Sequence, residues 1–260
     1  MSDRILFIDS IGFFRTIKDI INILDVMVAR GSGGAANNAY AAISKFFNWC
    51  ASRDLITASP CIGVERPSKK NSRDRVLSDS ETSAVWSAAS EVGFPFGNIV
   101  QLLMLTAQRR GEVATMERDH IDWDERIWHI PEELTKNSRP HAVPLSPYVL
   151  SIIEAVPMLH ARFFFPARGS TTTCFSGFGR SKERLDKELS IKPWILHDLR
   201  RTTATGMAGL GIQPHIVERV LNHSTGQLGG VAAVYNRFQY IDEMRDALEK
   251  WSEHVLSLQS

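Results

Sequence analysis

Four short stretches of the chain carry side chains that can hold and attack an anionic group such as a phosphate. They are Thr106-Ala-Gln-Arg-Arg-Gly-Glu112, Leu134-Thr-Lys-Asn-Ser-Arg139, His197-Asp-Leu-Arg-Arg-Thr202, and Leu221-Asn-His223 followed by Tyr235-Asn-Arg237. Arginine offers a planar fork of donors that matches phosphate oxygens in a way lysine does not. A tyrosine can attack phosphorus if a base removes its proton, because a free phenol has a pKa of about 10.

Each stretch taken alone has an ordinary structural explanation. Arg109 has the spacing to pair with Glu112 on a helix surface, and Lys136 has the setting of a solvated residue at a hairpin tip. Tyr235 has the setting of a helical tyrosine packed in a core. The chemical reading therefore depends on the four stretches occurring together.

The elements that must position these residues are mostly helical. A capping box, Ser78-Asp-Ser-Glu81, predicts a helix start. The apolar spacing and turn signals predict a helix over 98–107, short strands over 121–123, 126–130 and 141–145, a helix beginning at Ser146-Pro147, and helices from Trp194 to the C-terminus. The stretch 134–139 then forms the tip between the second and third strands. An apolar stripe makes 243–260 an amphipathic helix, and the sequence leaves open whether it packs on its own domain or on a neighbouring subunit.

The first part of the chain is also helical. Residues 1–64 show helical apolar spacing, interrupted by a glycine-rich turn at Gly31-Ser-Gly-Gly34. Residues 65–75 form a basic linker, and 76–260 make the larger domain. The predicted fold class is mainly α: a helical N-terminal domain, then a mostly helical domain with a small three-stranded antiparallel sheet.

The linker 65–75 is the clearest local excess of positive charge, although the whole chain has a net charge of only +1. Its basic residues are Arg66, Lys69, Lys70, Arg73 and Arg75. A solvated linker explains them, and so does contact with DNA phosphates if the two domains close around a duplex.

Composition and motif searches exclude several other classes of protein. The 260 residues are 43% hydrophobic and 23% charged, as in ordinary globular proteins. No apolar run reaches membrane-spanning length, and the start lacks the pattern of a secretory signal, so we expect a cytoplasmic protein. Neither zinc spacing nor a GxxxxGK[ST] loop occurs, so the sequence predicts no metal and no nucleotide cofactor.

Together and in this order, the four stretches resemble the tyrosine recombinase (phage integrase) family. The family pattern has an arginine in a Thr-Gly-x-Arg-x-x-Glu context, a lysine on a β-hairpin, a His-x-Leu-Arg box, a Leu-Gly-His box and a tyrosine shortly after. The matching positions are Arg109, Lys136, His197 with Arg200, His223 and Tyr235. The resemblance runs from about Ser78 to the C-terminus, and the helical segment before it is similar to the family's core-binding domain.

The resemblance implies a role for each position. Arg109, Arg200 and His223 would bind the scissile phosphate, and Tyr235 would attack it to form a 3′-phosphotyrosyl link. His197 would act as the base, and Lys136 would protonate the leaving 5′ oxygen. Glu112 would orient its neighbours.

Two positions depart from the family pattern, and one tyrosine competes with Tyr235. Ala107 and Asn222 stand where the pattern has glycine; both are small or turn-tolerant and lie away from the proposed chemistry. Tyr240 is a rival nucleophile by proximity, but only Tyr235 has the Tyr-Asn-Arg context, so we interpret Tyr240 as a packing residue.

The resemblance also implies partners. These are double-stranded DNA attachment sites, further copies of the chain in a tetramer on DNA, and an accessory DNA-bending protein, with the bacterial nucleoid as the location and a phage or other mobile element as the context. The phosphotyrosyl ester keeps the bond energy, so rejoining needs neither ATP nor metal.

Three alternatives remain at this point. A catalytically silent relative would bind DNA for synapsis or regulation, although all the candidate catalytic positions hold competent residues. A topoisomerase IB-like enzyme would relax DNA without exchanging strands. A helix-turn-helix repressor built on 196–221 would leave Arg109, Lys136 and Tyr235 unexplained.

Overall fold

The computed structural model describes residues 17–69, 74–223 and 239–259, and the chain divides into two compact units, Met1–Arg73 and Asp74–Ser260. Three of the predicted site residues, Lys70, Arg73 and Tyr235, lie outside the described residues.

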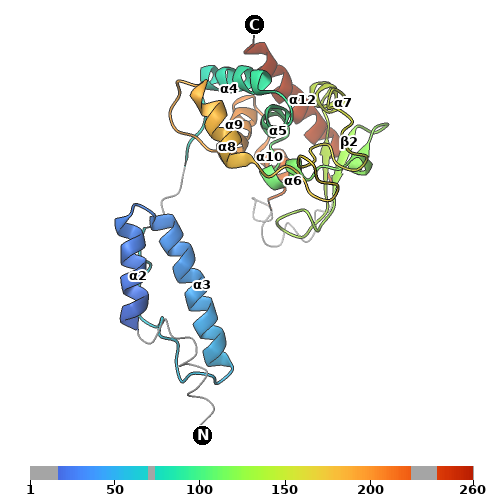
Figure 1. Cartoon of the computed structure of the whole chain (residues 1–260). Coiled ribbons are helices and arrows are strands. Elements are labelled where there is room, and N and C mark those ends of the chain that lie inside the picture. Colours follow the sequence, from blue (N-terminus) through green and yellow to red (C-terminus); the bar gives the residue numbers. More distant parts are fainter. Residues whose placement is uncertain (1–16, 70–73, 224–238, 260) are drawn as a thin grey trace. The chain divides into compact units, whose positions relative to one another are not determined.

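In its described residues, the first unit contains two packed helices, α2 (Ile17–Ala29) and α3 (Gly33–Ser52) (Figure 1). Gly31, between them, has a φ of +76°, which the missing Cβ makes inexpensive. Apolar residues at helical spacing form the small core: Ile20, Leu24, Ala36 and Cys61. The chain that follows α3 returns along this helix, and the Tyr40 hydroxyl of α3 donates to the Val64 carbonyl at 2.7 Å.

The second unit is built around one central helix, α5 (Phe96–Thr106) (Figure 1). Nearly every side chain of this helix is buried. The helices that pack against it include α4 (Asp79–Val92), α7 (Pro147–Glu154), α9 (Leu196–Gly209) and α12 (Ile241–Ser257). The predicted starts are confirmed. Ser78 and Glu81 form a capping box before α4, and Ser146 caps α7 with Pro147 in its first turn.

The three predicted strands form one antiparallel sheet in the order β1–β2–β3: β1 (Ile121–Asp122), β2 (Ile127–Ile130) and β3 (His141–Pro144). The register pairs Trp128 with Val143 and Ile130 with His141. Residues 131–140 therefore leave one end of the sheet as a loop, and this loop carries Lys136. The predicted class, mainly α with a small three-stranded antiparallel sheet, is confirmed.

Helix α12 packs into its own unit. The Trp251 indole Nε1 donates to the Met104 carbonyl of α5 at 2.7 Å, and Ser252 and Ser146 hydroxyls lie 2.9 Å apart. Where α12 packs on α9, Gly206 leaves the space that the Trp251 ring occupies. Among the described helices, none is long and apolar enough to cross a membrane.

The other helices of the described residues are short. They are α6 (Arg110–Ala114), a 3₁₀ turn at Arg118–His120, α8 (Phe178–Lys187) and α10 (Pro214–Val220). The sequence analysis did not predict α8, since Leu185 is its one fully buried side chain and the rest of the helix is strongly polar.

Candidate active site

The candidate site is organised by the C-terminal end of α10. The last carbonyls of a helix have no partner within it and carry partial negative charge, so they attract donors and cations. Here the carbonyls of Val220, Leu221 and Asn222 accept hydrogen bonds from side chains of three other parts of the unit: the segment leading into α6, helix α9 and the β2–β3 loop. His223 follows directly, so these bonds also fix where the His223 backbone begins.

Arg200 is the most enclosed cation of the site, with 4% of its surface exposed. Its Nη1 donates to the Ala107 carbonyl at 2.5 Å, and its Nη2 donates to the Leu221 carbonyl. Burial, with a further contribution from Arg109, lowers the pKa of Arg200 to about 10. The guanidinium therefore stays charged at neutral pH, and it joins the end of α5 to the end of α10.

Arg109 stands at the start of α6 and is held by Glu112. The Glu112 carboxylate, only 2% exposed, accepts from the Arg109 backbone N–H and from its Nη1, both at 2.8 Å. The Arg109 Nη2 lies 3.5 Å from the Asn222 carbonyl oxygen. One carboxylate thus fixes both the backbone and the guanidinium of Arg109, while about a fifth of the Arg109 side chain stays exposed (21%).

The two positions that depart from glycine in the family pattern both have left-handed backbones. Ala107 has a φ of +56° and Asn222 a φ of +47°. Asparagine tolerates this conformation because its side chain can bond locally, whereas alanine pays roughly 1–2 kcal/mol for it. Both departures thus lie at sharp turns beside the site. The positive φ that these turns require explains why the family pattern has glycine there.

Lys136 lies in the 131–140 loop with an exposed side chain. Its neighbour Thr135 is buried, and the Thr135 hydroxyl accepts from the Arg139 backbone N–H at 3.0 Å. Its other neighbour, Asn137, donates to the Asn222 side-chain oxygen at 2.9 Å. The loop that carries the lysine is therefore attached to the turn that precedes His223.

The two histidines lie at the rim of the site, each on a helix end. His197, in the first turn of α9, is exposed; partial burial lowers its pKa, and Arg201 and Arg200 act in the same direction. Arg109 adds to that lowering, so His197 lies within electrostatic range of both candidate phosphate-binding arginines. The His223 Nδ1 lies 2.8 Å from a Glu218 carboxylate oxygen of α10.

Sequence reasoning missed three residues that hold this site together: Gln108, Asn137 and His141. The Gln108 Nε2 donates to the Val220 carbonyl at 2.9 Å, and the His141 Nε2 lies 3.1 Å from the same oxygen. Burial lowers the pKa of His141 to about 4, so it is neutral at pH 7 and donates its Nε2 proton. Gln108 and Asn137 lie inside the motif stretches, but nothing in the sequence pairs them with residues 85 to 112 positions away.

The structure does not bring all predicted residues into this site. Arg66 and Lys69 belong to the first unit. Arg75 forms an ion pair with Glu81, with its Nη2 2.5 Å from the carboxylate, which lowers the pKa of Glu81 to about 2. The Tyr240 ring lies against the His215 ring, with 5.3 Å between centroids.

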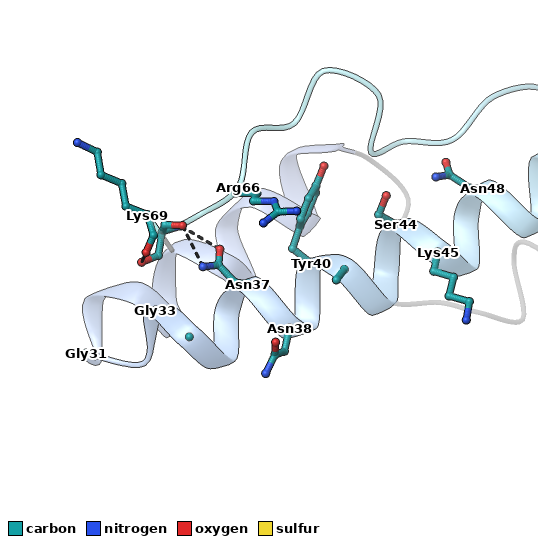
Figure 2. Close-up of a pocket in the computed structure, with 13 residues that line it drawn as sticks. Gly31, Gly33, Asn37, Asn38, Tyr40, Ser44, Lys45, Asn48, Arg66 and Lys69 are labelled. Atoms are coloured by element: carbon teal, nitrogen blue, oxygen red, sulfur yellow. Dashed lines mark hydrogen bonds between the residues drawn. The ribbon is translucent and has the colours of Figure 1, made fainter. Parts of the chain in front are cut away.

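A concave surface lies within the first unit, along one face of α3 (Figure 2). This groove has a volume of about 980 Å³. Asn37 joins its two sides, with hydrogen bonds of 2.9 and 3.2 Å to the backbone of Ser68. The other polar lining residues are Asn38, Tyr40, Ser44, Lys45, Asn48, Arg66, Ser68 and Lys69. None of the described lining residues is acidic.

In the described part of the chain, no three His, Cys, Asp or Glu side chains gather in a way that could hold a metal ion. The side chains that bond to the end of α10 are those of arginine, histidine, glutamine and asparagine.

Comparison with known proteins identifies relatives. The model of the phage integrase family matches residues 75–239. Prophage integrase IntA of Escherichia coli strain K12 is 24% identical over 249 residues, covering 93% of this chain and 59% of the relative. The shufflon-specific DNA recombinase of Escherichia coli is 28% identical over 210 residues, covering 75% of this chain and 51% of the relative. The chain thus spans between half and three fifths of the length of these relatives.

Solved structures show the same fold. A lambda integrase (75–356) dimer bound to a COC′ core site matches with a TM-score of 0.64 and 20% identity, over 81% of this chain and 79% of that one. The family match covers more than half of the sequence and includes every element that builds the α10 site. The chain belongs to the phage integrase family.

Proposed function

We propose that this chain is a site-specific DNA recombinase that cuts and rejoins DNA strands through a 3′-phosphotyrosyl link to Tyr235. The observation that carries the proposal is the end of α10, where side chains from the segment leading into α6, from α9 and from the β2–β3 loop converge on three consecutive carbonyls. Its two arginines, with Lys136 and His223 on adjoining segments, make a site suited to a phosphate that gains charge during attack.

In the proposed cleavage step, the Tyr235 phenolic oxygen forms a bond to phosphorus and the bond from phosphorus to the 5′ oxygen breaks. His197 takes the phenolic proton; its lowered pKa supports this role because it favours the neutral imidazole at pH 7. Lys136 gives a proton to the departing 5′ oxygen. Rejoining is the reverse reaction with a new 5′ hydroxyl, and the ester itself stores the energy that this step needs.

Arg109 and Arg200 stabilise the developing charge in this proposal, with His223 as a further donor. A guanidinium has five N–H donors, so the two carbonyl bonds of Arg200 do not exhaust it. Glu112 serves as the positioning residue for Arg109, since it holds both the backbone and the guanidinium.

The groove along α3 supports a DNA-binding role for the first unit. Helix α3 contains no aspartate or glutamate, and its groove face carries Asn38, Lys45 and Asn48. Amides can pair with the adenine edge and lysine with guanine or phosphate. Arg66 and Lys69, predicted as DNA-binding from the sequence, line the same groove. We propose that this face contacts duplex DNA and that Lys70, Arg73 and Arg75 extend the contact along the backbone.

The proposed partners are double-stranded DNA attachment sites, further copies of the chain in a tetramer on DNA, and an accessory DNA-bending protein. A lambda integrase tetramer bound to a Holliday junction shares the fold, with a TM-score of 0.63 over 81% of this chain, which supports the tetramer. Because the proposed substrate is bacterial and mobile-element DNA, the proposed location is the bacterial cytoplasm, at the nucleoid.

Strand exchange tests this function directly. Duplexes selected from a randomised pool by binding to the chain would be placed in a plasmid and in a labelled linear fragment. We expect labelled fragment joined to plasmid DNA, without metal or ATP. Relaxed plasmid with no exchanged strands would favour the topoisomerase-like alternative, and bound but uncut DNA would favour a silent relative.

A further inference from the structure

Asn137 and Asn222 form a reciprocal amide pair between two loops of the site. The Asn137 Nδ2 donates to the Asn222 Oδ1 at 2.9 Å, and the Asn222 Nδ2 donates back to the Asn137 Oδ1 at 3.4 Å. The Asn137 Nδ2 also lies 3.2 Å from the Asn222 backbone oxygen, which the Arg109 guanidinium approaches as well. The pair spans 85 positions of sequence and is partly buried.

The pair holds one of the two neighbours of Lys136, and the other neighbour is already held by hydrogen bonds within the loop. Thr135, on one side of Lys136, bonds the Arg139 backbone through its hydroxyl, as donor at 2.8 Å and as acceptor at 3.0 Å. Asn137, on the other side, is tied to Asn222. The backbone of Lys136 is thus held between two anchored neighbours, while its side chain stays exposed.

We propose that the Asn137–Asn222 pair is a latch that positions Lys136 for proton transfer. This inference rests on the proposed function, because it assigns the latch a role in the cleavage step. A general acid must lie within hydrogen-bond reach of the atom that it protonates, and an untethered loop satisfies that requirement only part of the time. The latch keeps the loop beside the turn that precedes His223. The position of the lysine is therefore fixed relative to the groups that bind the phosphate.

Asn222 suits this role because it meets two requirements at once. Its φ of +47° lies in the left-handed region, which asparagine tolerates and glycine adopts freely. Glycine at this position would keep the turn and remove only the side-chain half of the latch. Asn222→Gly is therefore a selective variant, and Asn137→Ala removes the whole latch, including the bond to the Asn222 backbone oxygen.

The test uses the leaving group to isolate Lys136. A duplex selected by binding to the full chain is prepared twice, with an oxygen or with a sulfur bridging phosphorus and the 5′ carbon. A thiol has a pKa of about 8.5, so a sulfur leaving group departs without a proton from the enzyme. Single-turnover formation of the protein–DNA adduct is measured on both duplexes. Loop mobility is measured separately, by hydrogen exchange of residues 131–140 without DNA.

On the oxygen duplex we expect Asn222→Gly and Asn137→Ala to slow adduct formation about tenfold, and Lys136→Ala to slow it about 100-fold or more. On the sulfur duplex all three variants should react within about twofold of wild type. The double variant should be no slower than Asn137→Ala, because Asn137→Ala already removes every hydrogen bond between the two residues. Glu133→Ala, an exposed change in the same loop, serves as the control and should match wild type on both duplexes.

The possible results distinguish a failure of the latch proposal from a failure of the proposed recombinase function. Faster exchange in the loop together with sulfur rescue supports the latch. Wild-type adduct formation with unchanged rates in both asparagine variants overturns the latch alone, and so does a slow rate that sulfur does not restore. No adduct with wild type on either duplex overturns the proposed function and this inference with it, whatever the exchange rates show.

Discussion

Replacing Glu112 by glutamine should weaken both the stability of the second unit and the DNA cleavage that we propose for it. Glu112 is 2% exposed and accepts two hydrogen bonds of 2.8 Å from Arg109. Glutamine has nearly the same shape, but it offers only one acceptor oxygen. Its amide N–H₂ then faces either the guanidinium or the backbone N–H, so one bond is lost and two donors meet.

The expected size follows from the contact. A hydrogen bond to a charged group contributes about 1.5–3 kcal/mol, so Glu112→Gln should lower the free energy of unfolding by about 2–3 kcal/mol. For a unit of this size, Asp74–Ser260, that corresponds to a fall in melting temperature of about 4–12 °C. Cleavage should fall by about 100-fold, because a misplaced Arg109 stabilises less of the charge that develops on phosphate.

A matched control is available in the same unit. Glu117 also pairs with an arginine, with 2.6 Å between its carboxylate and the Arg162 Nε, but that arginine is 63% exposed. Glu117→Gln removes the same charge and should cost less than about 1 kcal/mol. Urea unfolding of both variants measures the difference. Equal losses of unfolding free energy would refute the reasoning that burial makes the Glu112–Arg109 contact strong.

Three further predictions concern packing, pH and DNA binding. A Cβ added to Gly206 would lie 2.1 Å from the Trp251 ring, so Gly206→Ala should destabilise the chain by about 2–4 kcal/mol in thermal unfolding. Gly209 has open space around it, so Gly209→Ala should stay within about 0.5 kcal/mol of wild type. Equal effects of the two substitutions would contradict the close packing at Gly206. His141 has a folded pKa of about 4, below its ordinary 6.5, so its contribution to stability is full above pH 6.5 and is lost as the pH falls toward 4. Between pH 7 and pH 5, the free energy of unfolding in urea should therefore fall less in His141→Gln than in wild type. An equal fall in both proteins would contradict the lowered pKa of His141. Lys45→Ala should weaken duplex binding and reduce the slope of log affinity against log salt by about 0.9, whereas an unchanged slope would remove Lys45 from the proposed interface.

Local signals explain how much of the fold could be predicted from the sequence. The capping box at Ser78 and the Ser146-Pro147 pair each place a helix start within a few residues, and the alternation in 126–130 marks a strand. These signals lie within one turn or one strand. Helix α8 has no such signal, because its single buried residue, Leu185, leaves no apolar stripe to recognise.

The candidate site was predictable only in part. The motif residues could be found by type and spacing, but the bonds that assemble them run from side chains to backbone carbonyls far along the chain. A carbonyl has no sequence signature, so the end of α10 could not be recognised as the centre of the site. Asn222 was interpreted as simple variation from glycine, yet its side chain bonds the loop that carries Lys136.

The most direct test of the central claim is a covalent trap. The full chain would be incubated without metal on a selected duplex carrying a nick near the cleavage position, and adducts would be resolved on a denaturing gel. We expect wild type and Tyr240→Phe to form a protein–DNA adduct and Tyr235→Phe to form none. An adduct that persists in Tyr235→Phe, or no adduct on a duplex that the chain binds, would contradict the account.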